Sequence, residues 1–417
     1  MKDVKTIVDH LKDNDLFKIS LSSKEFFHSN VLAWLLEKNP EIAKLFMPRD
    51  EDGYKFVRVM RENHHFDLIL VFIPNNENVP ANLEEIFPNF GKTDRTIENN
   101  DLIESLKKCR FVVVENKFKS IPYADQLSKY DDKIEKDEVV FVRNKKKVPV
   151  ISMNKKNATC YLLSFDDNFE YKQWNNVSYK KLFEMLTNTP CKDPFSKEFV
   201  KCYKEFLDRV LELADNIQES ISEAADPFPK PDDINELKKI HMDDFYTKLW
   251  FSILLKKIKI CEKFKLDVKE RGYTRNCGLL DFKIEGDYHV WYGIQIQNNQ
   301  FRIIVEPKYG YIWKDRTCLE EKIKEYCEDI LDRMKKSSEN HYIFSNTKDL
   351  CAFGEFKYEY IYIGESKKRQ KIKSIEELTA MINNGLDAIS QSPLKNLEAK
   401  AEEKNKIKNE TNKDANL

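Results

Sequence analysis

Apolar residues follow two spacings in the first half of the chain, and segments of the two kinds alternate. Short apolar runs predict strands at 54–60, 64–73, 111–118, 139–144 and 159–165. Helical spacing predicts helices at 1–20, 23–38, 120–136 and 195–220. In the helix at 23–38, Phe27, Val31 and Leu35 lie on one side, and Ser23 is suited to cap it. The alternation predicts an α/β core in which helices flank a mixed central sheet.

Three prolines within residues 224–233 mark a candidate linker between two domains. Beyond it, helices are predicted at 234–262, 317–336 and 375–390, and strands at 279–285, 288–297, 300–306, 341–345 and 356–363. We expect a first domain at 1–222, a linker at 223–233, a C-terminal α+β domain at 234–395 and a charged, disordered tail at 396–417. The polar stretch at 74–108 is expected to be an insertion outside the sheet of the first domain.

Composition and charge narrow the classes of function. The 417 residues include 70 Lys and Arg against 71 Asp and Glu, so the formal net charge is −1. This balance argues against a protein that coats polyanions in general, but it is compatible with a local nucleic-acid groove. No two of the ten glycines lie fewer than six positions apart, which excludes the glycine-rich loops that bind nucleotide phosphates.

The sequence also bears on the compartment. It has no run of 18 apolar residues, and its first 15 residues lack the apolar core of a secretion signal. The nine cysteines are scattered without a Cys-x-x-Cys pair, so neither a zinc ribbon nor a disulfide framework is expected. We therefore expect a cytoplasmic protein without membrane association.

Charged residues at the end of the strand at 111–118 are the main chemical signal. Three valines precede Glu115, and Lys117 follows two positions later, so both side chains project from one face of a buried strand. Burying a carboxylate and an ammonium group is costly unless something compensates their charges. Asp67 stands at the start of another apolar strand. A divalent cation held by the two carboxylates would supply this compensation.

Two predicted helices contribute further polar residues. Gln126 and Tyr130 are four positions apart and therefore lie on one face of the helix at 120–136. Glu25 and His28 share a face of the helix at 23–38. Glu25 is a candidate ligand for a metal ion or for a water molecule.

One ordered set of residues combines these features: Glu25, Asp67, Glu115, Asn116, Lys117, Gln126 and Tyr130. This set resembles the motifs of the PD-(D/E)XK nuclease superfamily, and the similarity covers about residues 20–215. A departure is Phe66, which stands where the superfamily pattern has proline. The resemblance implies a restriction-endonuclease-like core and hydrolysis of phosphodiester bonds with Mg²⁺ or Mn²⁺.

The resemblance also implies a set of metal ligands. Asp67, Glu115 and the main-chain carbonyl of Asn116 would bind the cation. Glu25 would act through a water molecule bound to that cation.

The remaining motif residues would act on water and substrate. Lys117 would orient the attacking water and stabilise negative charge on the phosphate. Gln126 and Tyr130 would position water or a DNA phosphate. Another candidate group is formed by Lys145, Lys146 and Lys147. These lysines fit either a solvated hairpin tip or a contact with the DNA backbone, which would add affinity without sequence specificity.

Several competing patterns were weighed against this site. The acid-x-lysine pattern recurs at 131–133, 281–283, 306–308 and 355–357, so it has no specificity by itself. Asp281 and Glu306 are the strongest rivals, but no Gln-x-x-x-Tyr helix follows either of them. His64 and His65 lie in a predicted strand, where neighbours point to opposite faces, so they are not expected to share a zinc ion.

We expect a metal-dependent nuclease with DNA favoured over RNA, in bacterial restriction or antiphage defence. The C-terminal domain would select substrate, sense a signal, or contact a partner protein or a second copy of the chain. Two alternatives remain open at this stage. One is a non-catalytic module that binds nucleic acid or a signal on a nuclease scaffold, and the other is an RNA-cleaving effector.

Overall fold

The computed structural model of the chain covers most of residues 3–262 and separate segments beyond them. The described residues are 3–20, 25–47, 53–80, 83–87, 95–97, 99–119, 124–136, 138–143, 147–166, 171, 174–189, 191, 193–223, 226–262, 266–271, 278–286, 290–297, 300–307, 311–313, 329–330, 332–334, 336, 361–363, 372, 374–392 and 401–403.

The chain forms two compact units. The first contains Met1–Gln218 and Pro231–Leu249, and the second contains Glu219–Lys230 and Trp250–Leu417. Residues 231–249 thus group with the first unit, whereas the sequence pattern assigned most of them to the second domain. Buried Leu237, Ile240 and Phe245 account for this grouping, because they add to the apolar core of the first unit.

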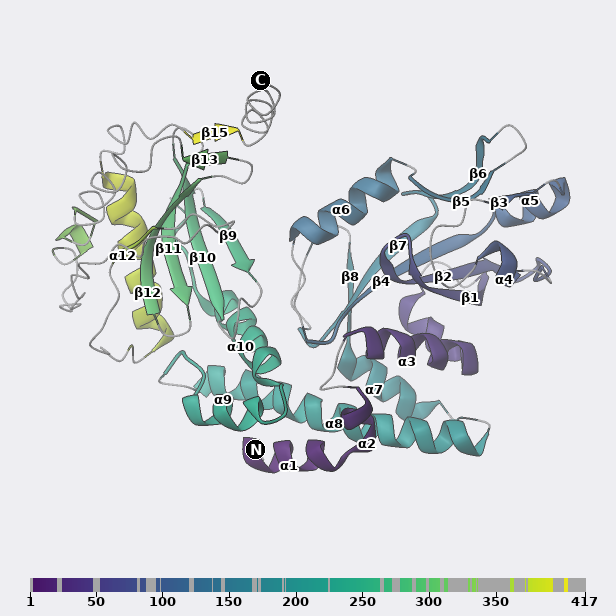
Figure 1. Cartoon of the computed structure of the whole chain (residues 1–417), viewed down its shortest axis with the longest axis horizontal. Coiled ribbons are helices and arrows are strands. Elements are labelled where there is room, and N and C mark those ends of the chain that lie inside the picture. Colours follow the sequence, from purple (N-terminus) through teal and green to yellow (C-terminus); the bar gives the residue numbers. More distant parts are fainter. Residues whose placement is uncertain are drawn as a thin grey trace, which may run out of the picture. The chain divides into compact units, whose positions relative to one another are not determined.

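A five-stranded mixed sheet forms the centre of the first unit (Figure 1). Its order is β1-β2-β4-β7-β8. These strands are β1 (Tyr54–Asn63), β2 (Phe66–Pro74), β4 (Arg110–Lys117), β7 (Ala158–Ser164) and β8 (Asn175–Ser178). The pairs β1–β2 and β2–β4 are antiparallel, while β4–β7 and β7–β8 are parallel. The predicted fold class, a mixed sheet flanked by helices, is confirmed.

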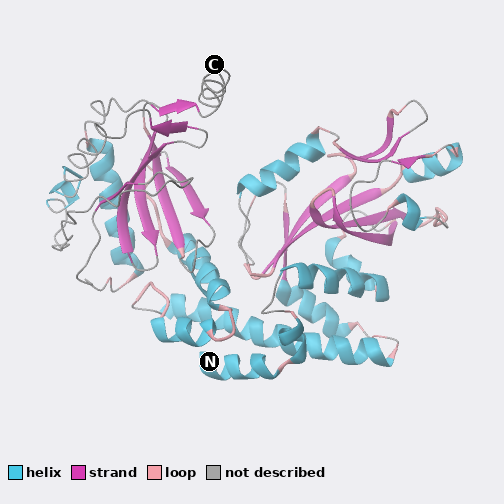
Figure 2. Ribbon diagram, viewed as in Figure 1, coloured by secondary structure: helices cyan, strands magenta, loops and turns pink. Residues whose placement is uncertain are grey.

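Helices flank this sheet (Figure 2). Besides the short helices between β2 and β4, the first unit contains α1 (Val4–Asp13), α2 (Asp15–Ile19), α3 (Glu25–Lys38), the 3₁₀ helix η1 (Pro40–Phe46), α6 (Ala124–Glu135), α7 (Tyr179–Asn188), most of α8 (Pro194–Glu223), α9 (Pro231–Lys238) and the start of α10 (Asp243–Lys257). Leu127 and Ile134 of α6 share an apolar cluster with Ile69, Val71 and Val113 of the sheet. Helix α3 lies on the other side of the sheet from α6 (Figure 1). The two faces therefore have different neighbours, and this difference positions the site.

The described residues between β2 and β4 lie outside the central sheet. Strand β4 pairs directly with β2, so the described residues between them add no strand to that sheet. They form α4 (Leu83–Ile86), β3 (Arg95–Thr96) and α5 (Asn100–Leu106). Strand β3 joins β5 (Val139–Arg143) and β6 (Pro149–Met153) in a separate three-stranded sheet.

The second unit contains a five-stranded antiparallel sheet of order β14-β12-β11-β10-β9. Its strands are β9 (Leu266–Arg271), β10 (Leu279–Glu285), β11 (Val290–Gln297), β12 (Gln300–Pro307) and β14 (Ile361–Ile363). Helix α12 (Ile375–Gln391) packs against β10 and β11 through buried Leu378, Ile382 and Leu386.

A short two-stranded sheet completes the second unit. Strand β13 (Tyr311–Trp313) pairs with β15 (Ala401–Glu403), so residues 401–403 of the expected disordered tail have a backbone partner. The predicted strand at 341–345 and most of the predicted helix at 317–336 lie outside the described residues. Among the described helices, none is both long and apolar enough to span a membrane.

Candidate active site

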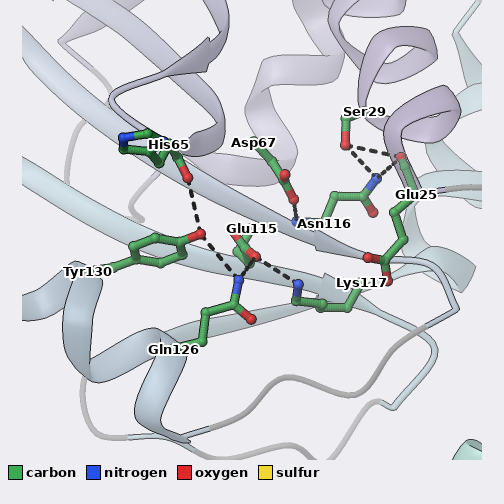
Figure 3. A network of polar contacts seen from close by, with 9 residues as sticks. All are labelled: Glu25, Ser29, His65, Asp67, Glu115, Asn116, Lys117, Gln126 and Tyr130. Carbon is green, nitrogen blue, oxygen red and sulfur yellow. Dashed lines mark hydrogen bonds and ion pairs between the residues drawn. The ribbon is translucent and has the colours of Figure 1, made fainter. Parts of the chain in front are cut away.

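The candidate site lies where β2 separates from β4. The pairing of these strands ends at Leu68 and Val114, while β4 continues alongside β7 as far as Lys117. Beyond the last pair, the main-chain N–H of Asn116 donates to the Asp67 carboxylate at 2.8 Å instead of to a strand carbonyl. The divergence of the strands therefore places Asp67 beside Glu115 (Figure 3).

Strand alternation decides which side chains meet at this place. Glu115 and Lys117 share the face of Val113, and Asp67 shares the face of Ile69, so all three lie on the side covered by α6. Asn116 points to the opposite side, toward α3, where its amide contacts Ser29. The predicted convergence of Asp67, Glu115 and Lys117 is seen in the geometry.

Glu115 lies at the centre of the polar contacts. It is 1% exposed, and its Oε1 accepts from Lys117 Nζ at 2.8 Å and from Gln126 Nε2 at 2.8 Å. Its Oε2 atom is buried and has no hydrogen-bond partner among the described residues. A buried carboxylate oxygen without a donor is destabilising, so this atom marks a place for a cation or a water molecule.

Electrostatics at the two carboxylates point the same way. Burial, which is the largest cause, and the nearby charge of Glu115 together raise the pKa of Asp67 to about 8. Burial also raises the pKa of Glu115, against the opposing effect of Lys117. Two buried carboxylates that resist ionisation together are stabilised in their charged form by a divalent cation.

Lys117 is held in its protonated form. Burial disfavours its ammonium group, but the carboxylates of Glu115, Glu25 and Asp67 outweigh this effect and raise its pKa above the ordinary value. The side chain is therefore a fixed positive charge at the end of β4, suited to donate to an anionic oxygen.

The residues present fit a hard divalent cation. The donor set comprises the carboxylates of Asp67 and Glu115, with the unpartnered Oε2 of Glu115 as the decisive atom. No cluster of three or more His, Cys, Asp or Glu side chains suited to metal binding occurs in the described part of the chain. Glu25 therefore does not complete a three-carboxylate cluster, and its predicted action through water stays a prediction.

Gln126 and Tyr130 of α6 anchor the site from one side. Besides Glu115, Gln126 Nε2 donates to the Tyr130 hydroxyl at 3.2 Å, and that hydroxyl donates to the carbonyl of His65 at 3.1 Å (Figure 3). The Tyr130 ring packs on Phe66 with centroids 4.8 Å apart. Burial raises the Tyr130 pKa to about 12, so the phenol keeps its proton.

His64 and His65 form the hairpin turn between β1 and β2 rather than part of a strand. Their φ angles are 54° and 71°, and the flanking Asn63 and Phe66 pair with each other. Positive φ at both central residues is typical of a two-residue type I′ turn. The strand assignment was wrong here because the apolar run begins only at Phe66. The turn matters for the site because its His65 carbonyl accepts a hydrogen bond from the Tyr130 hydroxyl.

Asn116 connects the site to α3 on the other side of the sheet. Its Nδ2 donates to Ser29 Oγ at 3.0 Å and to the Glu25 carbonyl at 3.4 Å, and its Oδ1 accepts from the Tyr179 hydroxyl. Glu25 thereby begins α3 next to the end of β4 (Figure 3). Its charge acts on Lys117 and Glu115, which agrees with its expected place near the site.

His28 belongs to the apolar core behind the site. It is fully buried, its ring stacks on Phe118 at 3.4 Å, and its Nδ1 lies 3.0 Å from the Tyr203 hydroxyl. Burial lowers its pKa well below the ordinary value, and the charge of Lys119 adds to this effect. It is therefore a neutral core histidine.

The other candidates are separate from this group. Lys147 is exposed in the turn between β5 and β6, and its carbonyl accepts from Arg143 at 3.0 Å. Lys145 and Lys146 lie outside the described residues. In the second unit the rival Asp281 is fully buried, 3.4 Å from Lys283 Nζ, and accepts from Gln295 at 2.9 Å. Asp281 and Lys283 are thus both buried on β10, in the sheet of the second unit.

A family model matches residues 14–208, and its description is the PD-(D/E)XK nuclease superfamily. The matched segment contains the whole constellation from Glu25 to Tyr179. This part of the chain belongs to the PD-(D/E)XK nuclease superfamily. The predicted resemblance is thereby confirmed for the first unit. Comparisons with curated proteins and with solved structures gave no significant match.

Sequence reasoning missed several residues around the site. Tyr179 was not among the candidate residues, and nothing in the sequence showed that its hydroxyl reaches Asn116. Lys119 and Asp244 form an ion pair at 2.9 Å although they are far apart in sequence. The only local signal for Lys119 was its position two residues after Lys117.

Proposed function

We propose that the PD-(D/E)XK domain hydrolyses phosphodiester bonds of nucleic acid, with Mg²⁺ or Mn²⁺ as cofactor and DNA as the preferred substrate. The observation that carries this proposal is the convergence of Asp67, Glu115 and Lys117, with a buried Glu115 oxygen that has no partner among the described residues. Most buried carboxylate oxygens in folded proteins have a hydrogen-bond donor, so this Glu115 oxygen, next to a second buried carboxylate, is suited to bind a cation.

Asp67, Glu115 and the main-chain carbonyl of Asn116 would hold the cation. When bound, a divalent cation supplies charge stabilisation at the phosphate and lowers the pKa of a coordinated water. The Asn116 N–H fixes the Asp67 carboxylate, and Gln126 fixes Glu115, so both acids are oriented before any ligand arrives. Preorganised ligands of this kind reduce the reorganisation that substrate binding requires.

Lys117 would stabilise the negative charge that develops on the phosphate oxygens during attack by water. Its ammonium group is already in place through the contact with Glu115, so the chain supplies a donor without further ordering. Gln126 and Tyr130 would act mainly as positioning residues, because their polar atoms contact Glu115 and the hairpin carbonyl of His65. Glu25 would act through water.

The preference for DNA and a role in bacterial restriction or antiphage defence are parts of the same proposal. They are supported by the restriction-endonuclease-like arrangement of the core and rest on that analogy. A cytoplasmic location fits the cysteines, because the five described ones are free thiols. Expression of wild type and Lys117→Ala in a phage-sensitive host tests the defence role, and only wild type is expected to lower the number of plaques.

Cleavage of supercoiled plasmid with Mg²⁺ or Mn²⁺ tests the enzymatic proposal. Wild type is expected to nick or linearise the plasmid, and Glu115→Ala and Lys117→Ala are expected to lower the rate at least about a hundredfold. Glu198→Ala and Lys201→Ala are matched controls, because these residues form an exposed ion pair at 3.1 Å on α8. Equal nicking by all five proteins would reject the proposal.

A parallel assay on single-stranded RNA separates the substrates. Faster cleavage of RNA than of DNA would replace the DNA proposal by the RNA-cleaving alternative. Binding of nucleic acid without cleavage under any metal condition would favour the non-catalytic module.

A further inference from the structure

The end of β4 that carries the site has lost one of its two neighbouring strands. Pairing with β2 stops at Val114, so residues 115–117 are paired with β7 alone. A strand segment that is paired along one edge opens more readily than a segment paired along both. Stable positions of Glu115 and Lys117 therefore require contacts from outside the sheet.

Such contacts come from residues that follow the family-matched segment. Lys119, two positions after Lys117, forms an ion pair with Asp244 Oδ1 at 2.9 Å and donates to the carbonyl of His241. Asp244 lies in the first turn of α10 and His241 in the turn before it, both after residue 208. The strand of the site is thus attached to a helix that the superfamily match does not include.

The turn between α9 and α10 has a defined geometry. The N–H of Met242 donates to the carbonyl of Leu237, and the N–H of His241 donates to the carbonyl of Lys238. His241 has a φ of 56°, so these bonds form a Schellman motif that ends α9. Leu237 and Met242 are both fully buried. The carbonyl of His241 is therefore fixed independently of Lys119.

The Asp244 carboxylate is also oriented, and its ion pair is shielded from solvent. Its Oδ1 accepts from the N–H of Phe245 at 2.9 Å as well as from Lys119. The side chains of Lys119 and Asp244 are 14% and 28% exposed. Those of Lys201 and Glu198, the ion pair on α8, are 63% and 68% exposed. Solvent and salt screen shielded charges less, so the pair with Asp244 restrains the strand end more than a surface pair would.

Aromatic packing attaches α10 to the same strand ends. The Phe245 ring lies 5.1 Å from the Phe165 ring between centroids, and Phe165 lies 5.0 Å from Phe118. Phe118 stands between Lys117 and Lys119 in the sequence, and Phe165 directly follows β7. The first turn of α10 therefore has a polar and an apolar attachment next to Lys117.

We propose that Asp244 is a positioning residue of the nuclease reaction, which binds Lys119 and thereby fixes the end of β4 at Lys117. This proposal rests on the proposed function. The effect of Asp244 passes through the main chain of residues 117–119 and involves no contact of Asp244 with the substrate. The functional unit of the nuclease then extends beyond residue 208, as far as the first turn of α10.

The carboxylates that would bind the cation have supports of their own. The N–H of Asn116 donates to Asp67, and Gln126 donates to Glu115. Loss of the contact with Asp244 would therefore displace mainly Lys117, the last residue of β4. A misplaced catalytic group lowers the rate of the chemical step, by up to about a hundredfold for a shift of about 1 Å. Binding of cation and substrate should change much less.

Kinetics and hydrogen exchange on the full chain test this proposal. The variants are Asp244→Ala, Lys119→Met, the double variant and, as the conservative change, Lys119→Arg. Asp15→Ala is the matched control, because Asp15 is a first-turn acid of α2 that pairs with Lys18 at 3.0 Å, but both side chains are exposed. Cleavage of one duplex DNA with Mg²⁺ gives kcat and KM, and Mn²⁺ affinity is measured by calorimetry. Mass spectrometry follows amide exchange in peptides that cover 111–119.

Asp244→Ala and Lys119→Met are each expected to lower kcat about tenfold, with KM and Mn²⁺ affinity within about twofold of wild type. The double variant should be as fast as either single variant, since all three lack the same contact. Lys119→Arg keeps the charge and should retain the wild-type kcat within about twofold. Amide exchange should become faster at 115–119 and stay unchanged in the peptide that covers 66–74. A merely structural role would speed exchange in both peptides and leave the kcat of the folded protein unchanged.

The proposal requires both a lower kcat and faster exchange at the strand end, so a wild-type value of either in Asp244→Ala would overturn it. Equal losses in Asp15→Ala would overturn it too. Additive losses in the double variant would show that Asp244 and Lys119 act separately, which also contradicts the proposal. Failure of both Asp244→Ala and Lys119→Met to fold would reject it, since the ion pair would then serve the stability of the whole unit.

The two proposals can fail separately. If wild type cleaves DNA and Asp244→Ala matches it in kcat, the positioning role fails and the proposed function stands. If wild type never cleaves nucleic acid but Asp244→Ala speeds exchange only at the strand end, the proposed function fails and the attachment of β4 to Asp244 stands. Absence of both effects would reject both.

Discussion

Asn116 uses its main chain and its side chain for different tasks on the two sides of one strand. Its main-chain N–H donates to the Asp67 carboxylate. Its side-chain amide donates to the Ser29 hydroxyl of α3 and accepts from the Tyr179 hydroxyl. A single residue therefore sets the distance between the carboxylate pair and the helix that carries Glu25. Its place between Glu115 and Lys117 gives it a positioning role that the acid-x-lysine pattern does not describe.

Replacing Tyr179 by Phe tests this support at the level of one hydroxyl. The buried Oδ1 of Asn116 would lose its donor, which is expected to lower the free energy of unfolding by about 1–3 kcal/mol. Urea denaturation measures the change. Tyr54→Phe serves as control, because Tyr54 is only half-buried and the stacking of Arg110 on its ring does not need the hydroxyl. Equal stability of Tyr179→Phe and wild type would contradict this account of Asn116.

The raised pKa of Asp67 predicts how stability depends on pH without metal. The folded-state pKa is about 8 against an ordinary value of 3.8, so the folded protein keeps a proton that the unfolded chain releases. The stabilisation from this group is complete below about pH 4 and is lost as pH rises to about 8. Thermal melting in EDTA should therefore show Asp67→Asn gaining stability relative to wild type as pH rises. Parallel curves for the two proteins would disprove the assignment.

At the scale of elements, the hairpin turn at His64 and His65 fixes where α6 docks. Its role depends on the main chain, because the carbonyl of His65 accepts from Tyr130 and the carbonyl of His64 accepts from Lys133. The positive φ angles of both residues are better suited to Asn and Gly.

Exchange of the exposed His65 for Gly is therefore expected to raise the free energy of unfolding by up to about 1 kcal/mol, with cleavage unchanged. His65→Ala keeps the strain at positive φ and should give no such gain. Chemical denaturation of the two variants provides the comparison, and a loss of more than about 1 kcal/mol in His65→Gly would show that its imidazole is needed.

Three of the strands that the sequence predicted have residues that are largely buried on both sides. Apolar runs marked β2, β4 and β7 because helices cover both faces of the central sheet. Strands β6 and β8 were missed, since their sequences, PVISM and NNVS, carry too few apolar residues to stand out from a loop. The predicted helix at 234–262 is two helices, because apolar spacing continues across the turn at His241, where φ is 56°.

The candidate site shows the same division between local and distant information. Glu115 with Lys117, and Gln126 with Tyr130, stand in two short motifs, and local spacing was enough to predict a shared face within each pair. Asp67 stands on another strand, and its place beside them was implied by the family resemblance. The contact of Lys119 with Asp244 joins positions 119 and 244, and no local pattern encodes such a pairing. Nor could periodicity reveal that the Glu115 carboxylate keeps one oxygen without a partner in the described structure.

At the scale of the whole molecule, two compact units with separate cores predict two unfolding transitions. Leu70 of the first unit and Ile294 of the second are both fully buried. Leu70→Ala and Ile294→Ala are each expected to cost about 2–5 kcal/mol, which lowers one melting temperature by roughly 5–15 °C. Scanning calorimetry should show each variant moving a different transition. One common transition that both variants lower equally would contradict two independent cores.

The central claim is that Asp67 and Glu115 bind a divalent cation and that this binding does not depend on Lys117. Calorimetric titration of Mn²⁺ into wild type, Glu115→Gln and Lys117→Met tests it most directly. We predict that wild type and Lys117→Met bind Mn²⁺ with similar affinity, although only wild type cleaves DNA, and that Glu115→Gln loses the binding. Titration of Glu115→Gln with the affinity of wild type would contradict the claim.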